Sequence, residues 1–364
     1  MNPVTSDESN DACTHDHAEY ARAAAILKCS DVWDMTIPWT PPVRDFDTLK
    51  RFKNSGFTYV SLTLQDWPPT LEGTLESIRE FKERALTEAT WLTMGTSIEE
   101  IESGRRAGKL VAGINSQDTR PAGEELERIG ILHSAGVRHM VLAYQVRNLV
   151  ADGCAETSDA GLSNYGRQFV REMNCVGMIV DCSHTGRRSS LEAMELSDRP
   201  TIFSHSNPYA LHPHIRNIND EQIRACAKGG GVVGVVGFGA FLGDAKATTE
   251  SVFRQIDYIA SLVGGEHVGL GTDFLPLLPY RDNRSAWLEM TANQKGWPDE
   301  SIAWPTHGTP TVPFEESSCF QPEQIVQLVR VMLRHGYSED DISRIVGGNF
   351  RRVYVAASAK RSPV

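Results

Sequence analysis

Eight short apolar runs, rich in β-branched residues, recur along this chain of 364 residues and alternate with longer amphipathic stretches. This alternation is typical of parallel strands that are joined by crossover helices. Because eight strands close a barrel, we predict an α/β fold of the (β/α)₈ TIM-barrel type. The runs are SDVWDMTI (30–37), FTYVSLTL (57–64), LVAGIN (110–115), HMVLAY (139–144), VGMIVDCS (176–183), PTIFSHS (200–206), GVVGVVGF (231–238) and HVGLGTDF (267–274).

A doubly wound open sheet is the structural alternative. Such a sheet normally has a glycine-rich phosphate-binding turn after its first strand, and the segment DMTIPWTPP is no such turn. We therefore expect a disordered tail at 1–16 and a single barrel domain over 17–364. A long Pro- and Trp-rich loop at about 275–320 and two C-terminal helices complete this domain, and a loop of that length is usually functional.

Charge and composition exclude several classes of partner. The chain carries 36 basic and 47 acidic residues, a net charge of −11, and it has no basic block that could follow a phosphate backbone. It shows neither a secretory signal pattern nor a run of ~18 apolar residues. Seven scattered cysteines without a C-x-x-C pair indicate reduced, mostly buried thiols. We expect a cytoplasmic protein that binds neither nucleic acid nor a membrane.

The residues at the predicted strand ends indicate where chemistry can occur, because barrel active sites lie at the C-terminal ends of the strands. His184, His205 and Asp273 follow the fifth, sixth and eighth strands, while Asn115 ends the third and Asp34 lies on the first. Imidazole nitrogens and carboxylate oxygens are ligands that a divalent metal such as Zn²⁺ accepts. A metal-dependent hydrolase is one interpretation; a metal-free barrel enzyme and a binding protein remain the others.

Four ordered motifs resemble those of the membrane dipeptidase (renal dipeptidase) family of zinc metallopeptidases, over about residues 20 to 357. The segment GLSNYGRQFVREMNCVGMIVDCSHTG is similar to the stretch that reads GLS-x-x-G and ends in D-x-S/A-H. PTIFSHSNPYALHPHIRNIND is similar to P-x-I-x-S-H-S followed by R-N-x-x-D. HVGLGTDFLP resembles G-x-G-x-D-F-D-G, and GGNFRRV resembles G-G-N-x-x-R-V.

The resemblance implies a barrel that holds two zinc ions, with a His-x-Asp pair on the first strand and a bridging Glu on the third. It places His184 and His205 on the two histidines of the second zinc site. It also places Asp273 on the acidic residue beside the attacking water. Arg216 falls on the arginine that receives the substrate carboxylate, and we take Asn148 as a second substrate-binding residue.

The chain departs from the family pattern at the first zinc site. Where the family has D-G-H-N-D-x-P, this chain reads VWDMTIP, which places Asp34 on the His and Thr36 on the Asp. The bridging Glu falls on Asn115, whose neutral amide lacks the charge needed to hold two cations close together. Tyr144 replaces the histidine that polarises the substrate carbonyl, and its hydroxyl can still donate a hydrogen bond to an oxyanion.

These departures favour one zinc ion per chain over two, with His184, His205, Asp34 and Asn115 as candidate ligands. Asp273 and Tyr144 are the candidate catalytic residues. The expected activity is cleavage of an amide bond in a dipeptide or similar small substrate that carries a carboxylate. A relative recruited to another small-molecule reaction, with one metal or none, and an inactive binding protein stay open. The resemblance also favours a homodimer.

Overall fold

The computed structural model describes residues 7–39, 44–65, 68–88, 90–276 and 316–358, together with residues 282, 284, 285 and 312. Most of the predicted loop at about 275–320 lies outside these residues. In the described part, eight parallel strands follow one another in the order β1-β2-β4-β5-β6-β7-β8-β9, and β3 pairs with β4 beside this path. The strands are β1 (Trp33–Pro38), β2 (Tyr59–Thr63), β3 (Leu92–Met94), β4 (Leu110–Ser116), β5 (Val137–Val141), β6 (Ile179–Asp181), β7 (Ile202–Phe203), β8 (Val232–Val235) and β9 (Val268–Leu270).

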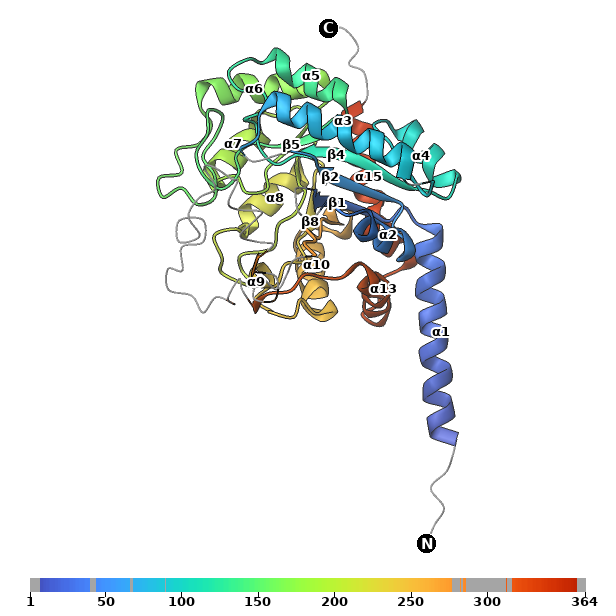
Figure 1. Ribbon diagram of the computed structural model, residues 1–364. Coiled ribbons are helices and arrows are strands. Elements are labelled where there is room, and N and C mark those ends of the chain that lie inside the picture. The colour runs from blue at the N-terminus through green and yellow to red at the C-terminus, as the bar shows by residue number, and fades with distance from the viewer. Residues whose placement is uncertain are drawn as a thin grey trace.

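Helices alternate with the strands and form an outer layer around them (Figure 1). Eight parallel strands with interleaved helices confirm the predicted (β/α)₈ barrel. Among the described helices, none has both the length and the apolar character needed to cross a bilayer. The helices are α1 (Asp7–Cys29), α2 (Phe46–Asn54), α3 (Leu71–Glu88), α4 (Ile98–Arg106), α5 (Glu127–Ala135), α6 (Asn164–Val176), α7 (Arg187–Leu196), α8 (Asp220–Lys228), α9 (Gly239–Leu242), α10 (Thr249–Val263), η1 (Gly265–His267), η4 (Pro322–Gln324), α13 (Ile325–Arg334), α14 (Glu339–Ser343), η5 (Arg344–Gly348) and α15 (Asn349–Ser358).

Helix α6 illustrates how local sequence sets these elements. Ser163 caps its first turn by accepting a hydrogen bond from the Gly166 N–H at 2.8 Å. Phe169 and Met173, four residues apart, are buried on one face, so the helix packs that face against the barrel. Gly177 ends the helix with φ of 84°, a left-handed conformation that glycine adopts without strain.

The first helix, α1, begins at Asp7 and extends from the body of the molecule in Figure 1. Its middle is anchored by two arginines of α13: Arg330 pairs with Asp16, and Arg334 pairs with Glu19 at 2.5 Å. The remainder of the predicted tail, residues 1–6, lies outside the described residues, and the predicted division into tail and domain stays a prediction.

The barrel interior changes from apolar to polar along the strand direction. One buried cluster includes Trp33, Tyr59, Val111 and Ile179, which lie in the N-terminal parts of their strands or at a strand start. Further along the same strands, the interior side chains hydrogen-bond to one another and are polar. Apolar side chains therefore fill the barrel at the N-terminal ends of the strands. The polar side chains that could bind or react lie at the C-terminal ends, which we call the mouth.

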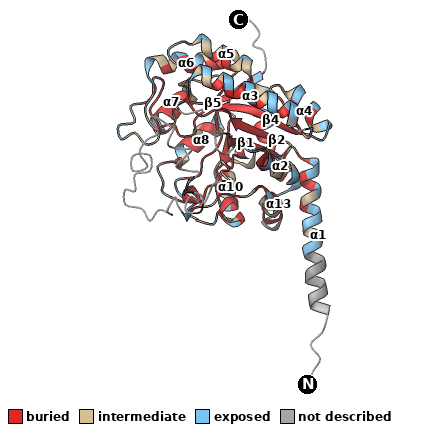
Figure 2. Ribbon diagram, in the orientation of Figure 1, coloured by how far each residue is buried: buried red, intermediate tan, exposed pale blue. Residues whose placement is uncertain are grey.

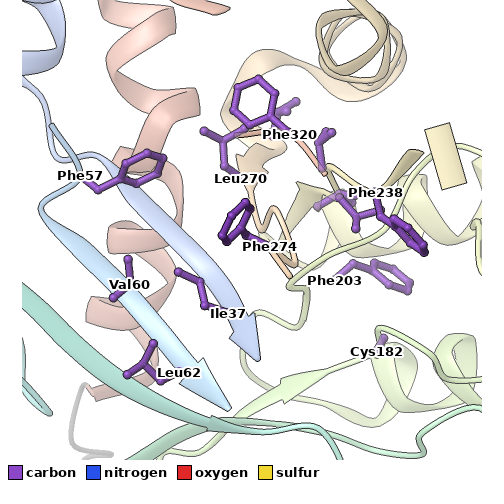
Figure 3. Close-up of a cluster of buried hydrophobic side chains, with 14 of the residues drawn as sticks. Ile37, Phe57, Val60, Leu62, Cys182, Phe203, Phe238, Leu270, Phe274 and Phe320 are labelled. Atoms are coloured by element: carbon purple, nitrogen blue, oxygen red, sulfur yellow. The ribbon is translucent and has the colours of Figure 1, made fainter. Parts of the chain in front are cut away.

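The larger hydrophobic core includes residues of both the strands and the helices. Figure 2 shows that the strands are almost entirely buried, whereas the surrounding helices are buried only in part. Figure 3 shows Ile37 of β1 and Val60 and Leu62 of β2 in this cluster, with Phe274 and Phe203 further along the sheet. Cys182 belongs to the same cluster and is fully buried, as expected for a buried thiol.

Polar contacts join the first strand of the barrel to the segment after the last one. The Asp273 N–H donates to the Thr36 carbonyl oxygen at 3.1 Å. The Thr272 N–H and hydroxyl both donate to the Asp34 carboxylate, the N–H at 3.0 Å. We call these contacts of Asp34, Thr36, Thr272 and Asp273 the seam, because they close the circle between β1 and β9.

Candidate active site

His184 and His205 lie together at the mouth, on the segments that follow β6 and β7. Their Nε2 atoms are 2.9 Å apart, and the His205 Nδ1 atom lies 2.7 Å from the Ser204 hydroxyl. His184 has φ of 61°, a left-handed conformation that is uncommon for a non-glycine residue. This turn directs its ring towards His205, so the structure brings together the two predicted imidazole ligands.

Both imidazoles are neutral at physiological pH. Burial, followed by the positive charge of Arg216, lowers the pKa of His184 and of His205 well below the usual value. A neutral imidazole carries a lone pair that can bind a cation, whereas an imidazolium does not. The pair therefore offers metal-binding nitrogen atoms without competition from protons.

Tyr144 lies beside this histidine pair, and the Asp273 carboxylate interacts electrostatically with Tyr144 and Arg216. The Tyr144 ring lies against the His184 ring, with their centroids 4.2 Å apart. Burial and the nearby Asp273 carboxylate raise the pKa of Tyr144, so its hydroxyl keeps its proton. Burial raises the pKa of Asp273 to about 7, with Arg216 opposing the shift and Asp34 adding to it. Asp273 can thus exchange a proton near neutral pH, which suits a general base.

Arg216 is a buried cation on the loop after β7, with a relative exposure of 1%. Its Nη1 donates to the Ser206 hydroxyl at 3.0 Å, and its Nη2 donates to the His205 carbonyl oxygen at 2.5 Å. Its Nε is buried and has no hydrogen-bond partner among the residues that the structure describes. A buried guanidinium N–H without an acceptor is costly, so this group is suited to receive an anionic oxygen from a ligand.

Asp34 is engaged at the seam. Its Oδ1 accepts hydrogen bonds from the Thr36 N–H and the Thr272 N–H, at 3.1 and 3.0 Å. Burial raises the pKa of Asp34 to about 6, despite the hydrogen bonds that it accepts. Metal binding by this carboxylate, which stays a prediction, would compete with its contacts across the seam.

Asn115 is held between two hydroxyl groups of β2. Its Oδ1 accepts a hydrogen bond from the Thr63 hydroxyl at 2.8 Å, and its Nδ2 donates to the Ser61 hydroxyl at 3.0 Å. The amide oxygen of Asn115 thus already accepts a hydrogen bond. Thr36, which stands in place of the aspartate of the first zinc site, has only a hydroxyl group, and this lies 3.2 Å from the His205 Nδ1. At two positions of the first zinc site of the resemblance, this chain thus has the neutral residues Thr36 and Asn115, and each is hydrogen-bonded to a different partner.

Asn148 has a structural role in the loop after β5. Its Nδ2 donates to the Leu142 carbonyl and the Thr119 hydroxyl, and its Oδ1 accepts from the N–H groups of Val150 and Ala151. A substrate contact would have to compete with these bonds. The substrate-binding role of Asn148 stays a prediction, without support from its hydrogen bonding.

The two imidazoles are the predicted donors that the structure brings within contact of each other. Two ligand nitrogens on a tetrahedral zinc ion, each about 2.0–2.1 Å from it, lie about 3.3 Å apart. The two Nε2 atoms are 2.9 Å apart, a hydrogen-bond distance, so they would have to separate by a few tenths of an ångström to bind one ion. Among the described residues, no three His, Cys, Asp or Glu side chains are grouped so that they could hold a metal ion. An ion at the two imidazoles would complete its coordination with water or substrate.

Three residues at this mouth were given no role by the sequence. Asp181 and His139 are buried and contact each other, and Ser204 contacts His205. Asp181 lies within the D-x-S-H motif, which was the available signal. Its contacts arise because β6 and β7 are neighbouring strands, and no sequence pattern predicts this pairing directly.

Comparisons with known proteins agree with this architecture. The model of the membrane dipeptidase family (peptidase family M19) matches residues 43–303. Dipeptidase tcpJ of Claviceps purpurea is 32% identical over 281 residues, which is 74% of this chain and 57% of the relative. The chain spans about half the length of the curated relatives that it matches.

Two solved structures share the fold along nearly their whole length. An amidohydrolase from Pseudomonas aeruginosa is 25% identical, with a TM-score of 0.79, and the match covers 92% of this chain and 98% of that one. A metallopeptidase from Rhodobacter sphaeroides, solved with a phosphinate mimic of the dipeptide L-Ala-D-Ala, is 19% identical, with a TM-score of 0.71. That match covers 90% and 99% of the two chains. Since the family model alone matches more than half of the residues, this chain belongs to the membrane dipeptidase family, peptidase family M19.

Proposed function

We propose that this chain is a metal-dependent hydrolase that cleaves the amide bond of a dipeptide or a similar small substrate with a free carboxylate. The observation that carries the proposal is the buried Arg216, whose Nε lacks an acceptor and whose Nη2 bonds to His205 itself. A cation fixed next to the imidazole pair can anchor a substrate carboxylate within reach of the groups that act on the amide.

Each residue then has one task. Arg216 binds and orients the carboxylate. Tyr144, which stays protonated, donates a hydrogen bond to the oxygen that gains negative charge during attack. Asp273 takes a proton from the attacking water and passes it to the leaving amine, because its pKa of about 7 allows both directions.

We further propose that His184 and His205 hold one zinc ion per chain. When bound there, zinc supplies Lewis-acid polarisation and activates water at neutral pH. The two lowered imidazole pKa values and the 2.9 Å separation support one ion at this position. The neutral Thr36 and Asn115 argue against a second ion. Asp34 and Asn115 remain candidate ligands of the single ion.

The substitutions at the first zinc site favour a second candidate function, in which a different small carboxylate-bearing molecule is the substrate. One experiment separates the two. The full chain is analysed for metal and then assayed against dipeptides that include L-Ala-D-Ala, against N-acyl amino acids, and against the matching dipeptide amides.

The proposal predicts about one zinc per chain, turnover of free-acid dipeptides, and loss of both zinc and turnover in His184→Ala. His335→Ala is the matched control, since His335 lies at the end of α13, against Phe253. Two zinc ions per chain would contradict the one-ion site. Metal content without turnover of any dipeptide would favour the second function, and metal-free inactive protein would indicate a binding role.

Location and assembly are further proposals. The six cysteines among the described residues, Cys29, Cys154, Cys175, Cys182, Cys226 and Cys319, are free thiols, which supports a reducing compartment such as the cytoplasm. Cell fractionation tests this location. A homodimer is tested by sedimentation of the full chain, where a mass of about 40.2 kDa would indicate a monomer instead.

A further inference from the structure

The two segments that carry His184 and His205 are joined by very little regular sheet. Strand β7 has only two residues, and its ladder with β6 consists of the single pair Asp181 and Ile202. One more backbone bond, from the Cys182 N–H to the Ile202 carbonyl at 2.8 Å, follows this pair. Beyond it, contacts other than a strand ladder must set the distance between the imidazoles.

The Asp181 carboxylate supplies such a contact. Its Oδ1 accepts hydrogen bonds from the Ser183 N–H at 3.0 Å and from the Ser204 N–H at 3.1 Å. Each serine directly precedes one of the two histidines. A single, fully buried oxygen atom therefore ties together the backbone of both histidine segments.

The serine side chains extend this connection to the imidazoles. The His205 N–H donates to the Ser183 hydroxyl at 3.1 Å, and the hydroxyls of Ser183 and Ser204 are 3.3 Å apart. The Ser204 hydroxyl lies 2.7 Å from the His205 Nδ1. Contacts of this kind orient a ring and fix which of its nitrogens carries the proton.

His139 of β5 supports Asp181 from the other side. Its Nδ1 lies 3.2 Å from the Asp181 Oδ2, and its Nε2 lies 3.0 Å from the Ser61 hydroxyl. Burial alone would raise the pKa of Asp181, but the hydrogen bond and charge of His139 hold it below the usual range. The carboxylate is thus ionised and has acceptor capacity for both serine N–H groups.

We propose that Asp181, supported by His139, is a positioning residue that sets the separation and orientation of His184 and His205. The left-handed backbone of His184 needs such support, because a strained conformation persists only where surrounding contacts determine it. The proposal concerns the geometry of the imidazole pair, and its catalytic consequence rests on the function proposed above.

The test compares Asp181→Asn with wild type in the full chain. The asparagine keeps the size of the side chain but loses the charge, and its NH₂ group faces a nitrogen of His139. We expect the kcat for a free-acid dipeptide to fall about 10- to 100-fold, with a smaller change in KM. The ring ¹⁵N signals of His184 and His205, recorded by NMR without metal, are expected to shift.

Asp244→Asn is the matched control. The Asp244 carboxylate also accepts two backbone N–H groups, from Lys246 and Thr248, but has no hydrogen bond to either imidazole segment. We expect unchanged ring signals and kcat within about twofold of wild type in this variant. A general effect of replacing a carboxylate that accepts two backbone N–H groups would appear in both variants, whereas a positioning effect appears only in Asp181→Asn.

Unchanged ring signals in a folded Asp181→Asn protein would overturn the inference. Should that variant fail to fold, His139→Gln keeps the carboxylate and is expected to shift the same two ring signals.

Hydrogen exchange in the wild-type protein is a third readout. The Ser183 and Ser204 amides are expected to exchange slowly with solvent. Rapid exchange of both amides would refute the proposal. Because these readouts need no turnover, they stand even if dipeptides are not the substrate.

Discussion

Among single residues, Arg216 gives the clearest test of substrate class. Arg216→Lys keeps the positive charge but loses the fork of N–H donors, so binding of a carboxylate weakens. For a free-acid dipeptide we expect kcat/KM to fall roughly 10- to 100-fold, mostly through KM, which corresponds to the loss of one charged hydrogen bond. The measurement is steady-state kinetics of both proteins on a dipeptide and on its C-terminal amide.

The dipeptide amide is the control, because it offers no carboxylate to Arg216. Wild type and Arg216→Lys should turn it over at similar, low efficiencies. An equal loss on the dipeptide and on its amide would instead mean that the substitution disturbs His205, whose carbonyl Arg216 contacts.

Asp273 gives the pH dependence of the reaction. A base with a pKa of about 7 is mostly protonated at pH 6 and mostly free at pH 8, so kcat/KM should rise through about pH 7. In Asp273→Asn we expect kcat to fall by about 10²- to 10⁴-fold and this rise to disappear. The check is a profile of kcat/KM from pH 5 to 9, and an unchanged rise in the variant would assign it to another group.

At the level of elements, periodicity located all eight strands of the barrel but not their ends. The run HMVLAY at 139–144 indicated a strand, whereas β5 covers Val137–Val141, because the chain leaves the ladder where Tyr144 joins the mouth. Strand β3 (Leu92–Met94) was missed, and it pairs with β4 outside the main path of the barrel. Residue types at strand ends are local in sequence, so the placement of His184 and His205 at one mouth could be predicted, while their role as metal ligands stays a prediction.

The contacts between neighbouring strands could not be predicted in the same way. Asp181 and His139 act across three strands, and their pairing depends on the register of β5 with β6. The hydrogen bond from the Thr272 N–H to the Asp34 carboxylate forms only because the segment after β9 lies next to β1. A single sequence gives residue types at strand ends, but the partner of each polar atom is fixed only when the barrel closes.

Two glycines, one on β8 and one just after β9, show how closely these segments approach the backbone that follows β7. A Cβ on Gly234 of β8 would lie 2.1 Å from the Ser204 carbonyl oxygen, and one on Gly271 would lie 1.9 Å from it. Because this oxygen belongs to the backbone, it cannot move aside without shifting His205. We expect Gly234→Ala to destabilise the protein by about 1–3 kcal/mol or more, and to lower kcat as well.

Urea unfolding and steady-state assays measure both effects. Gly130→Ala on α5 is the control, since a Cβ there would meet nothing within 4 Å. That substitution should stabilise the protein by roughly 0.5–1 kcal/mol and leave kcat unchanged. A Gly234→Ala protein as stable and active as wild type would show that β7 can move away from β8.

For the molecule as a whole, the seam links barrel closure to pH through Asp34. Its pKa is about 6 in the folded barrel and 3.8 when unperturbed, so between these values the folded state binds more protons than the unfolded state. The contribution of Asp34 to the free energy of unfolding therefore decreases as the pH rises from about 4 to 6. Its ionisation then costs about 3 kcal/mol of stability at pH 7.

Asp34→Asn removes this titration while keeping an acceptor for the Thr272 N–H. Relative to wild type, the variant should gain about 2–3 kcal/mol between pH 4 and pH 7, measured by urea unfolding of metal-free protein. The buried histidines titrate in both proteins, so their contribution cancels in the difference. Parallel stability curves would show that the Asp34 carboxylate is not perturbed by closure of the barrel.

The same comparison with zinc added tests the predicted ligand role of Asp34. A cation on this carboxylate would stabilise its ionised form, so zinc would lower its pKa in the folded protein. The stability difference between wild type and Asp34→Asn would then lose its dependence on pH. If zinc stabilises both proteins equally and the dependence persists, the ion is held at the imidazole pair alone, and Asp34 serves only the seam.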